Sequence, residues 1–190
     1  MDFLAMPAAA SWTHSGVRVG FEVLFVDADH RLRGRTSARE GASTWYVGYQ
    51  IDVDADWRTT SVHAVNSTAS GDREVVLGRT PDDRWTVNGE TRPDLDGCQD
   101  VDFESSAVTN TLPVHRLPFV LGETFEVPAA FVQADDLSVI RIEQRYTLLS
   151  SEEQRHVFHY ESATFDFECE LTYDASGLVL DYPGIAIRDR

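Results

Sequence analysis

The segment Phe165–Tyr173, which reads FDFECELTY, decides the fold class of this 190-residue chain. Apolar and polar side chains alternate along it, so one face of the segment is apolar and the other is mostly acidic. Successive side chains of a β-strand point to opposite faces, and antiparallel sheets commonly pack one face on the core while the other meets water. The segment therefore predicts a half-buried antiparallel strand.

Similar strand-like segments recur along the chain, and polar turn residues separate them. They are Val17–Val26, Leu32–Ser37, Ser43–Val53, Trp57–Val65, Phe125–Val132 and Leu137–Leu148. Pro128 cannot donate a hydrogen bond to a strand ladder, so it favours an edge strand or a bulge within its segment. Short strands with regular turn signals predict one sandwich, barrel or roll.

A hairpin and one short helix complete the predicted elements. Asn88-Gly89 stands between strand-like residues, and this dipeptide favours a tight hairpin because both turn positions need a positive φ. Leu112–Leu117 is the best helix candidate, with Thr111 as its N-cap and Pro113 in its first turn. The chain shows no fixed repeat and no linker. We therefore expect residues 1–190 to form a single, mostly β domain.

The charge is strongly acidic. Sixteen basic residues, all of them arginine, face 32 acidic residues, which gives a formal net charge of −16. Such a surface repels phosphate backbones and anionic headgroups, so we expect no nucleic-acid partner. The acidity fits a soluble protein, an adaptation to a salty cytoplasm, or a genome that replaces lysine with arginine, and the sequence leaves these three explanations open.

Cysteine usage and the N-terminus favour a cytoplasmic protein. Cys98 and Cys169 have no spacing typical of a zinc site, so two buried thiols in a reducing compartment are expected rather than a disulfide. Met1–Trp12 lacks the basic start and the apolar stretch of a signal peptide. No apolar run approaches the ~20 residues of a spanning helix, so no transmembrane segment is expected. The sequence indicates no cofactor.

The densest group of reactive side chains lies in Gly97–Leu117. A catalytic interpretation takes Cys98 as a nucleophile with His115 as its base, or uses Asp100 and Asp102 as an acid/base pair. A structural interpretation, which we favour, has one of the two aspartates anchoring Arg116. In that interpretation Asn110 and Thr111 cap the short helix. No recognised catalytic motif accompanies these residues, so we expect no catalytic residue.

Two other groups suggest ligand or metal chemistry. Trp57-Arg58 places an aromatic ring beside a guanidinium, a pair that could hold a polar headgroup or simply pack at the surface. His156 and His159 have a spacing that ligates metal on a helix. The intervening Val157 and Phe158 favour a strand instead, where residues three apart face opposite sides. We therefore expect no metal site.

Several segments together resemble the bacterial family known as putative glycolipid-binding proteins, which was first catalogued as a domain of unknown function. The resemblance covers nearly the whole chain, and its middle and C-terminal segments are the most specific. The segments are Trp45–Tyr49, Trp57–Thr59, Gly97–Asp102, Thr109–Leu117 and Gly177–Gly184.

The resemblance implies a many-stranded antiparallel sheet wrapped as a spiral β-roll or half-barrel around one short helix. It also implies a comparison with periplasmic lipoprotein carriers, from which the idea of glycolipid binding was drawn, and it brings no catalytic residues. The sequence departs from the family at His115, where a second basic residue is expected before Arg116. The alternating strands agree with this picture, since a wrapped sheet needs an apolar inner face and a plug to fill its hollow.

We therefore predict a non-catalytic protein that binds a lipid or glycolipid in or near the β-roll, and a homodimer is compatible with this prediction. The alternatives are a small hydrolase or isomerase that uses Asp100, Asp102 and His115, and a protein-interaction module. The predicted ligand-binding residues are Trp57, Arg58, Asp100, Asp102, Asn110, Thr111, His115, Arg116 and Tyr182.

Overall fold

The computed structural model describes residues 3–27 and 31–189, and these residues are mostly β-strand. The helical elements are two 3₁₀ turns, η1 (Pro93–Leu95) and η2 (Val108–Asn110), and one helix, α1 (Thr111–Arg116). The strands are β1 (Ala9–His14), β2 (Val19–Val26), β3 (Leu32–Glu40), β4 (Ser43–Val53), β5 (Thr59–Thr68), β6 (Gly71–Arg79), β7 (Trp85–Val87), β8 (Glu90–Thr91), β9 (Asp100–Phe103), β10 (Thr124–Glu126), β11 (Ala129–Val132), β12 (Val139–Ile142), β13 (Gln144–Glu152), β14 (Arg155–Ser162), β15 (Phe167–Asp174), β16 (Val179–Tyr182) and β17 (Ala186–Arg188).

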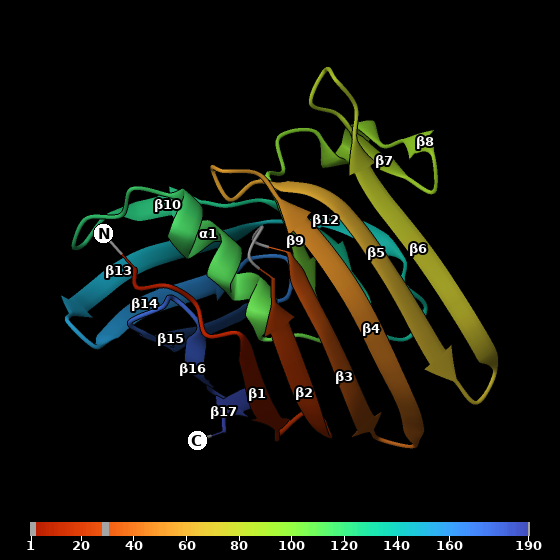
Figure 1. Ribbon diagram of the computed structural model, residues 1–190, viewed down its shortest axis with the longest axis horizontal. Helices are drawn as coiled ribbons and strands as arrows, with labels where there is room; N and C mark the ends of the chain where they lie inside the picture. The colour runs from red at the N-terminus through yellow and green to blue at the C-terminus, as the bar shows by residue number, and fades with distance from the viewer. Residues whose placement is uncertain (1–2, 28–30, 190) are drawn as a thin grey trace.

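One large antiparallel sheet carries the architecture. Its 14 strands run in the order β10-β13-β14-β15-β16-β17-β1-β2-β3-β4-β5-β6-β7-β8, and its two edge strands do not pair with each other. The sheet curves around α1, which lies in its hollow (Figure 1). The expected fold class, a mostly β open roll around one short helix, is therefore confirmed.

A smaller sheet of three strands lies within the curve of the large one. Its order is β12-β11-β9, and the β11–β9 pair is parallel. Every residue of β9 and of β11 is buried, as expected for strands covered on both faces. Thr59 connects this sheet to β5, because its backbone N–H donates to the Gln99 carbonyl and its hydroxyl accepts from the Val101 N–H.

Two segments predicted as single strands are each divided between the sheets. Phe125–Val132 breaks at Val127-Pro128 into β10 of the large sheet and β11 of the small one. Leu137–Leu148 breaks at Glu143 into β12 and β13 in the same way. Proline cannot continue a ladder, which explains the first break. Alternation alone did not reveal the second break.

Two other strand boundaries were wrong by two residues. Trp57 has a φ of 64° and sits in the turn before β5. A bulge opposite Asp52 and Val53 then buries Thr59 and exposes Thr60, which reverses the expected facing of this end of the strand. Phe165 lies in the turn before β15, and the alternation begins at Phe167.

The predicted hairpin and helix are present, with one correction. Asn88 and Gly89 have φ values of 51° and 85° and join β7 to β8. The helix begins one residue earlier than expected, directly after η2, and Asn110 is its N-cap without a capping side-chain bond. The capping roles given to Asn110 and Thr111 are therefore wrong. Asn110 Oδ1 accepts from the Tyr146 hydroxyl, and the Thr111 hydroxyl donates to the Gly177 carbonyl.

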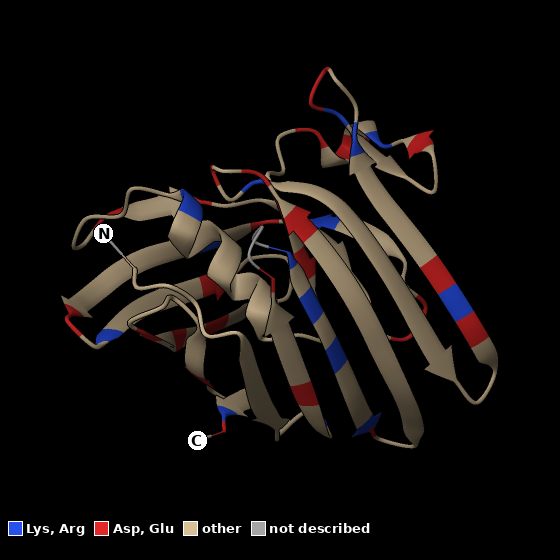
Figure 2. Ribbon diagram, viewed as in Figure 1, with Lys and Arg blue, Asp and Glu red and all other residues tan. Residues whose placement is uncertain are grey.

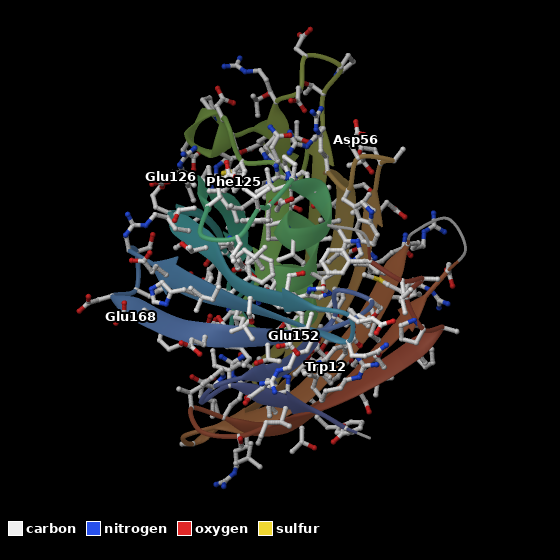
Figure 3. The ribbon with its side chains drawn as sticks, turned by 90° about the vertical axis from the view of Figure 1, so that its left-hand side faces the viewer. Trp12, Asp56, Phe125, Glu126, Glu152 and Glu168 are labelled. Atoms are coloured by element: carbon white, nitrogen blue, oxygen red, sulfur yellow. The ribbon has the colours of Figure 1, made fainter. Side chains whose placement is uncertain are left out.

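The core fills the space between the large sheet, α1 and the small sheet (Figure 3). Trp12, Trp45 and Trp85 are buried in it, and Trp57 is partly buried against it. The indole of Trp12 donates to the Val179 carbonyl at 2.7 Å, so its polar atom is satisfied. In the described part of the chain, no helix has the length and apolarity to cross a bilayer.

Gly34 provides a stability prediction. It pairs with Tyr49 across β3 and β4, and a Cβ atom at Gly34 would lie 2.1 Å from the tyrosine ring. The Tyr49 hydroxyl donates to buried Glu22 at 2.8 Å, so the ring cannot move without losing this bond. We expect Gly34→Ala to lower the free energy of unfolding by about 2 kcal/mol in urea titrations. Gly48→Ala on β4 is the control, because the added carbon would lie 3.5 Å from its nearest neighbour, the Arg35 side chain, which is an ordinary van der Waals contact.

Candidate functional site

A cavity of about 410 Å³ lies between the small sheet and a part of the large sheet formed by β14–β16, the turn after β16, the residues just before β2 and the end of β3. This volume falls within the range of ~300–1,000 Å³ that is usual for ligand cavities. Six aromatic rings contribute to its lining: Phe103, Phe131, Tyr160, Phe165, Phe167 and Tyr182. Its wall is therefore largely apolar.

The aromatic wall is assembled from residues far apart in the sequence. Phe131 of β11 lies 5.0 Å from the ring of Phe165, which belongs to the turn before β15. Tyr160, Phe167 and Tyr182 pack against one another with centroid distances of 6.1–6.3 Å. Because neighbouring strands and a turn hold these rings, the wall is preformed in this structure.

Five polar side chains of the lining are buried: Arg18, Asp102, Ser106, Asn110 and Ser162. Asp102 accepts a hydrogen bond from the Thr109 hydroxyl at 2.6 Å, and burial raises the pKa of its carboxyl to about 6. Asn110 is anchored through its carbonyl oxygen by Tyr146. The Ser162 hydroxyl, also buried, has no hydrogen-bond partner among the described residues. Buried polar groups are normally hydrogen-bonded, so Ser162 could bond to a ligand or to water in the cavity.

Arg18, Glu40 and Glu104 form a charged group that also lines the cavity. The Arg18 guanidinium is buried, donates to the Glu104 carbonyl at 2.5 Å, and lies 3.5 Å from the Glu40 carboxylate and 3.8 Å from that of Glu104. Its charge is also 5.4 Å from the centre of the Trp45 ring. With two carboxylates around the arginine and Asp102 also in the lining, the cavity has no excess positive charge.

A buried carboxylate supports the wall from behind. Glu22 accepts from the Tyr49 hydroxyl and the Ala107 N–H, at 2.8 and 2.9 Å, and from the Ser106 hydroxyl. Its second oxygen also lies 3.3 Å from His14 Nε2. Phe103, a cavity residue, stacks on Tyr49 at 5.2 Å. The network thus ties β2 and β4 to the loop after β9 and fixes one side of the cavity.

Asp100 and Arg116 form an ion pair next to the small sheet. The guanidinium donates to both carboxylate oxygens, at 3.0 and 2.6 Å, and only 1% of the Asp100 side chain is exposed. The predicted anchoring of Arg116 by one of the two aspartates is confirmed. Asp102 lies on the same strand but bonds Thr109 instead, so the two carboxylates do not share the arginine.

A third group of predicted residues lies apart from the cavity lining. His115 stacks on Trp57 at 4.0 Å and on Phe3 at 4.4 Å, and its Nε2 lies 3.0 Å from the Ser176 carbonyl. Thr111 bonds Gly177 nearby, and Arg58 is exposed beside Trp57. The nine predicted site residues are therefore dispersed, and Asp102, Asn110 and Tyr182 are the ones that line the cavity.

The predicted thiol and metal chemistry can also be compared with the structure. Both cysteines are free, and burial raises the pKa of Cys98 to about 11, which is unfavourable for a nucleophile.

His156 is buried and His159 is partly exposed on β14, so the two face opposite sides as expected. His159 instead lies within 4.8 Å of Glu161 and Glu168 on the outer face, and Glu161 also bonds Arg145 at 2.7 Å. Figure 3 shows Glu168 pointing away from the sheet.

Most residues of the cavity lining were not predicted from the sequence. Arg18 and Ser162 gave no signal in the sequence, but Glu22 did. A polar residue at an inward position of an alternating segment was the available signal. Glu22 faces the same side of its strand as the buried Leu24, whereas Phe21 and Val23 face the other side. A charge placed on the core side of a strand indicates a buried network or a site.

The fold and the site together define a β-roll with a ligand-sized, half-open aromatic cavity and a few buried polar groups. The chain belongs to the family described as putative glycolipid-binding, whose model matches residues 9–188. It is also similar to a crystal structure of a DUF1089 family protein from Pseudomonas aeruginosa, with 27% identity, a TM-score of 0.80, and coverage of 100% of this chain and 97% of the other. None of the curated proteins compared with it matches.

Proposed function

We propose that the protein binds an amphipathic lipid or glycolipid in the 410 Å³ cavity, without catalysing a reaction on it. The single observation that carries this proposal is the chemistry of the lining, which combines six aromatic rings with the buried polar groups of Asp102, Asn110 and Ser162. Ligand cavities of this kind use apolar walls for affinity and a few polar groups for orientation. The family description points to the same ligand class.

The lining also indicates which end of the ligand goes where. Sugar hydroxyls both donate and accept, so they can bond the Asp102 carboxyl, the Asn110 amide and the Ser162 hydroxyl. An alkyl chain would lie against Phe131, Phe165 and the other rings. Because Arg18 is already surrounded by carboxylates, a phosphate or sulfate group would gain no free cation there. The proposed ligand is therefore uncharged at its polar end.

The alternative function, a hydrolase or isomerase that uses Asp100, Asp102 and His115, has less support. Asp100 has both oxygens engaged by Arg116, and His115 is stacked on Trp57. Of the three residues, only Asp102 lines the cavity. An acid, a base and a nucleophile must lie within hydrogen-bond reach of one reacting position, and this arrangement does not assemble them.

Octyl glucoside, an uncharged glycolipid mimic, provides the test when it is used below its micelle concentration. We expect saturable binding in isothermal titration calorimetry, and we expect Phe165→Ala to weaken it about tenfold, because burial of an aromatic side chain against a ligand is worth roughly 1.5 kcal/mol. Phe165 lies in a turn and is 48% exposed, so its replacement should leave the fold intact.

Leu149→Ala is the matched control, since Leu149 is 43% exposed and is not part of the cavity lining. It should bind octyl glucoside as the unchanged protein does. An unchanged affinity in Phe165→Ala, or equal weakening in both variants, would contradict binding in this cavity.

A further inference from the structure

The outer face of β2–β4 carries an exposed patch of apolar and basic side chains, which we call the outer patch. It consists of Val19, Phe21, Phe25, Arg35, Arg39 and Tyr46. Val19, Phe21 and Phe25 are 62%, 46% and 50% exposed. They alternate along β2 with the inward-facing Glu22 and Leu24, so the sheet itself holds them in solvent. Contiguous exposed apolar side chains mark surfaces that contact a membrane or another protein.

The strand register places the two kinds of side chain next to one another. Val19 pairs with Arg39 across β2 and β3, and Val23 pairs with Arg35. On the next strand, Tyr46 pairs with Ser37, and the Arg35 guanidinium lies 5.0 Å from the centre of the Tyr46 ring. The patch is therefore one surface of apolar groups bordered by a row of cations.

The charge of this surface is opposite to that of the whole chain. Figure 2 shows several basic residues along β3, whereas the neighbouring strands β2 and β4 are mostly uncharged. The acidic residue on β2 is Glu22, which is buried. Arg33 is paired with Asp27, but Arg35 and Arg39 form no ion pair with any described carboxylate. In a chain of net charge −16, two such arginines on one face are a local exception.

The strands that carry the outer patch, together with the residues just before β2, also contribute residues to the cavity. Val17 is 59% exposed, lines the cavity and stands two residues before Val19. Arg18 lies between them in the sequence and also lines the cavity. At the end of β3, Glu40 lines the cavity directly after Arg39 of the patch. The ends of β2 and β3 therefore connect the outer patch on one face of the sheet to the cavity on the other.

We propose that the outer patch docks the protein on a bilayer that contains anionic phospholipids. Phenylalanine and valine side chains would enter the interface, and Arg35 and Arg39 would meet the lipid phosphates, in the manner of other basic and apolar membrane-binding surfaces. Because the chain carries a net charge of −16, this basic and apolar face is the orientation that we expect an anionic bilayer to favour. A second copy fits the patch less well, because two-fold pairing sets each patch against itself and brings like charges together.

Vesicle co-sedimentation tests this proposal at low salt, with phosphatidylcholine vesicles that contain either no phosphatidylglycerol or about a third of it. We expect binding to the anionic vesicles only. Arg35→Gln/Arg39→Gln should weaken it roughly 25-fold, since about 1 kcal/mol per basic residue near an anionic surface is about fivefold. Phe21→Ser/Phe25→Ser should weaken binding about tenfold at every salt concentration, whereas the contribution of the arginines should disappear as salt rises.

Arg73→Gln and Val76→Ser are matched controls, because both residues are exposed on β6, outside the outer patch. They should bind anionic vesicles as the unchanged protein does. Lack of vesicle binding by the unchanged protein, equal binding to both vesicle types, or equal losses in the β6 variants would overturn the proposal. Sedimentation equilibrium provides a further check, since a dimer that Phe21→Ser/Phe25→Ser dissociates would assign the patch to a second copy. Octyl glucoside binding is measured without vesicles, so failure of docking and failure of the cavity proposal are distinguishable.

Discussion

Arg116→Ala is expected to lower the free energy of unfolding by about 3–5 kcal/mol, because it leaves the charge of Asp100 buried without a partner. The carboxylate accepts two hydrogen bonds from Arg116, at 3.0 and 2.6 Å. Burial raises the pKa of Asp100 even with the arginine present. Without Arg116 this pKa rises further, so the destabilisation should be larger at pH 8 than at pH 5, where protonation of Asp100 removes part of the cost.

Urea unfolding of the two proteins at both pH values measures this effect. Arg145→Ala is the matched control, since Arg145 also binds a carboxylate, that of Glu161, at 2.7 Å, but on the exposed side of the large sheet. Exposed pairs contribute at most about 1 kcal/mol. If Arg116→Ala cost no more than Arg145→Ala, the Asp100–Arg116 pair would not be the anchor of β9 that the structure indicates.

Asp102→Asn is expected to make the protein more stable relative to the unchanged chain as the pH rises from about 4 to about 7. Burial raises the pKa of Asp102 from 3.8 to about 6, so in this window the native state holds a proton that the unfolded chain has released. When the native state binds more protons than the unfolded chain, the free energy of unfolding falls as the pH rises. Asparagine does not titrate, so the variant avoids a loss on the order of 3 kcal/mol.

The local contacts of Asp102 favour a clean measurement. The substituted amide keeps the local hydrogen bond, because the Thr109 hydroxyl can donate to an amide oxygen as it donates to the carboxylate. Asp136→Asn is the control of opposite sign, since the Ser138 backbone N–H lowers the pKa of Asp136. That variant should lose stability relative to the unchanged chain as the pH rises through the low-pH range. A flat difference between Asp102→Asn and the unchanged protein would mean that Asp102 is not the buried acid described above.

Much of the fold followed from period-two alternation. The strand Ser43–Val53 was predicted with the bounds that the structure shows, because the burial of one face is visible in the local sequence. The turn at Asn88-Gly89 was also predicted, because a positive φ is a local requirement. The breaks at Pro128 and Glu143 were not, since moving a strand from one sheet to another depends on the curvature of the whole roll. The bulge beside Val53 likewise changes the facing of Thr59 without altering the pattern of apolar residues.

The site was less predictable than the fold. The dense stretch Gly97–Leu117 did contain the buried Asp100–Arg116 ion pair, and five of its residues line the cavity: Asp102, Phe103, Glu104, Ser106 and Asn110. Other polar side chains of this stretch contact residues around α1; His115, for example, stacks on Trp57. The cavity wall comes from segments distant in sequence, so only the register of the large sheet brings them together. A single sequence carries no information about such register between remote strands.

Photo-crosslinking with an alkyl glucoside that carries a diazirine on its chain tests the central claim most directly. After irradiation and proteolysis, mass spectrometry identifies the modified residues. The account predicts modification of the aromatic lining around Phe131, Phe165 and Phe167, with loss of the signal when excess octyl glucoside competes. Modification confined to the exposed face of β2, or labelling that octyl glucoside does not displace, would contradict lipid binding inside the roll.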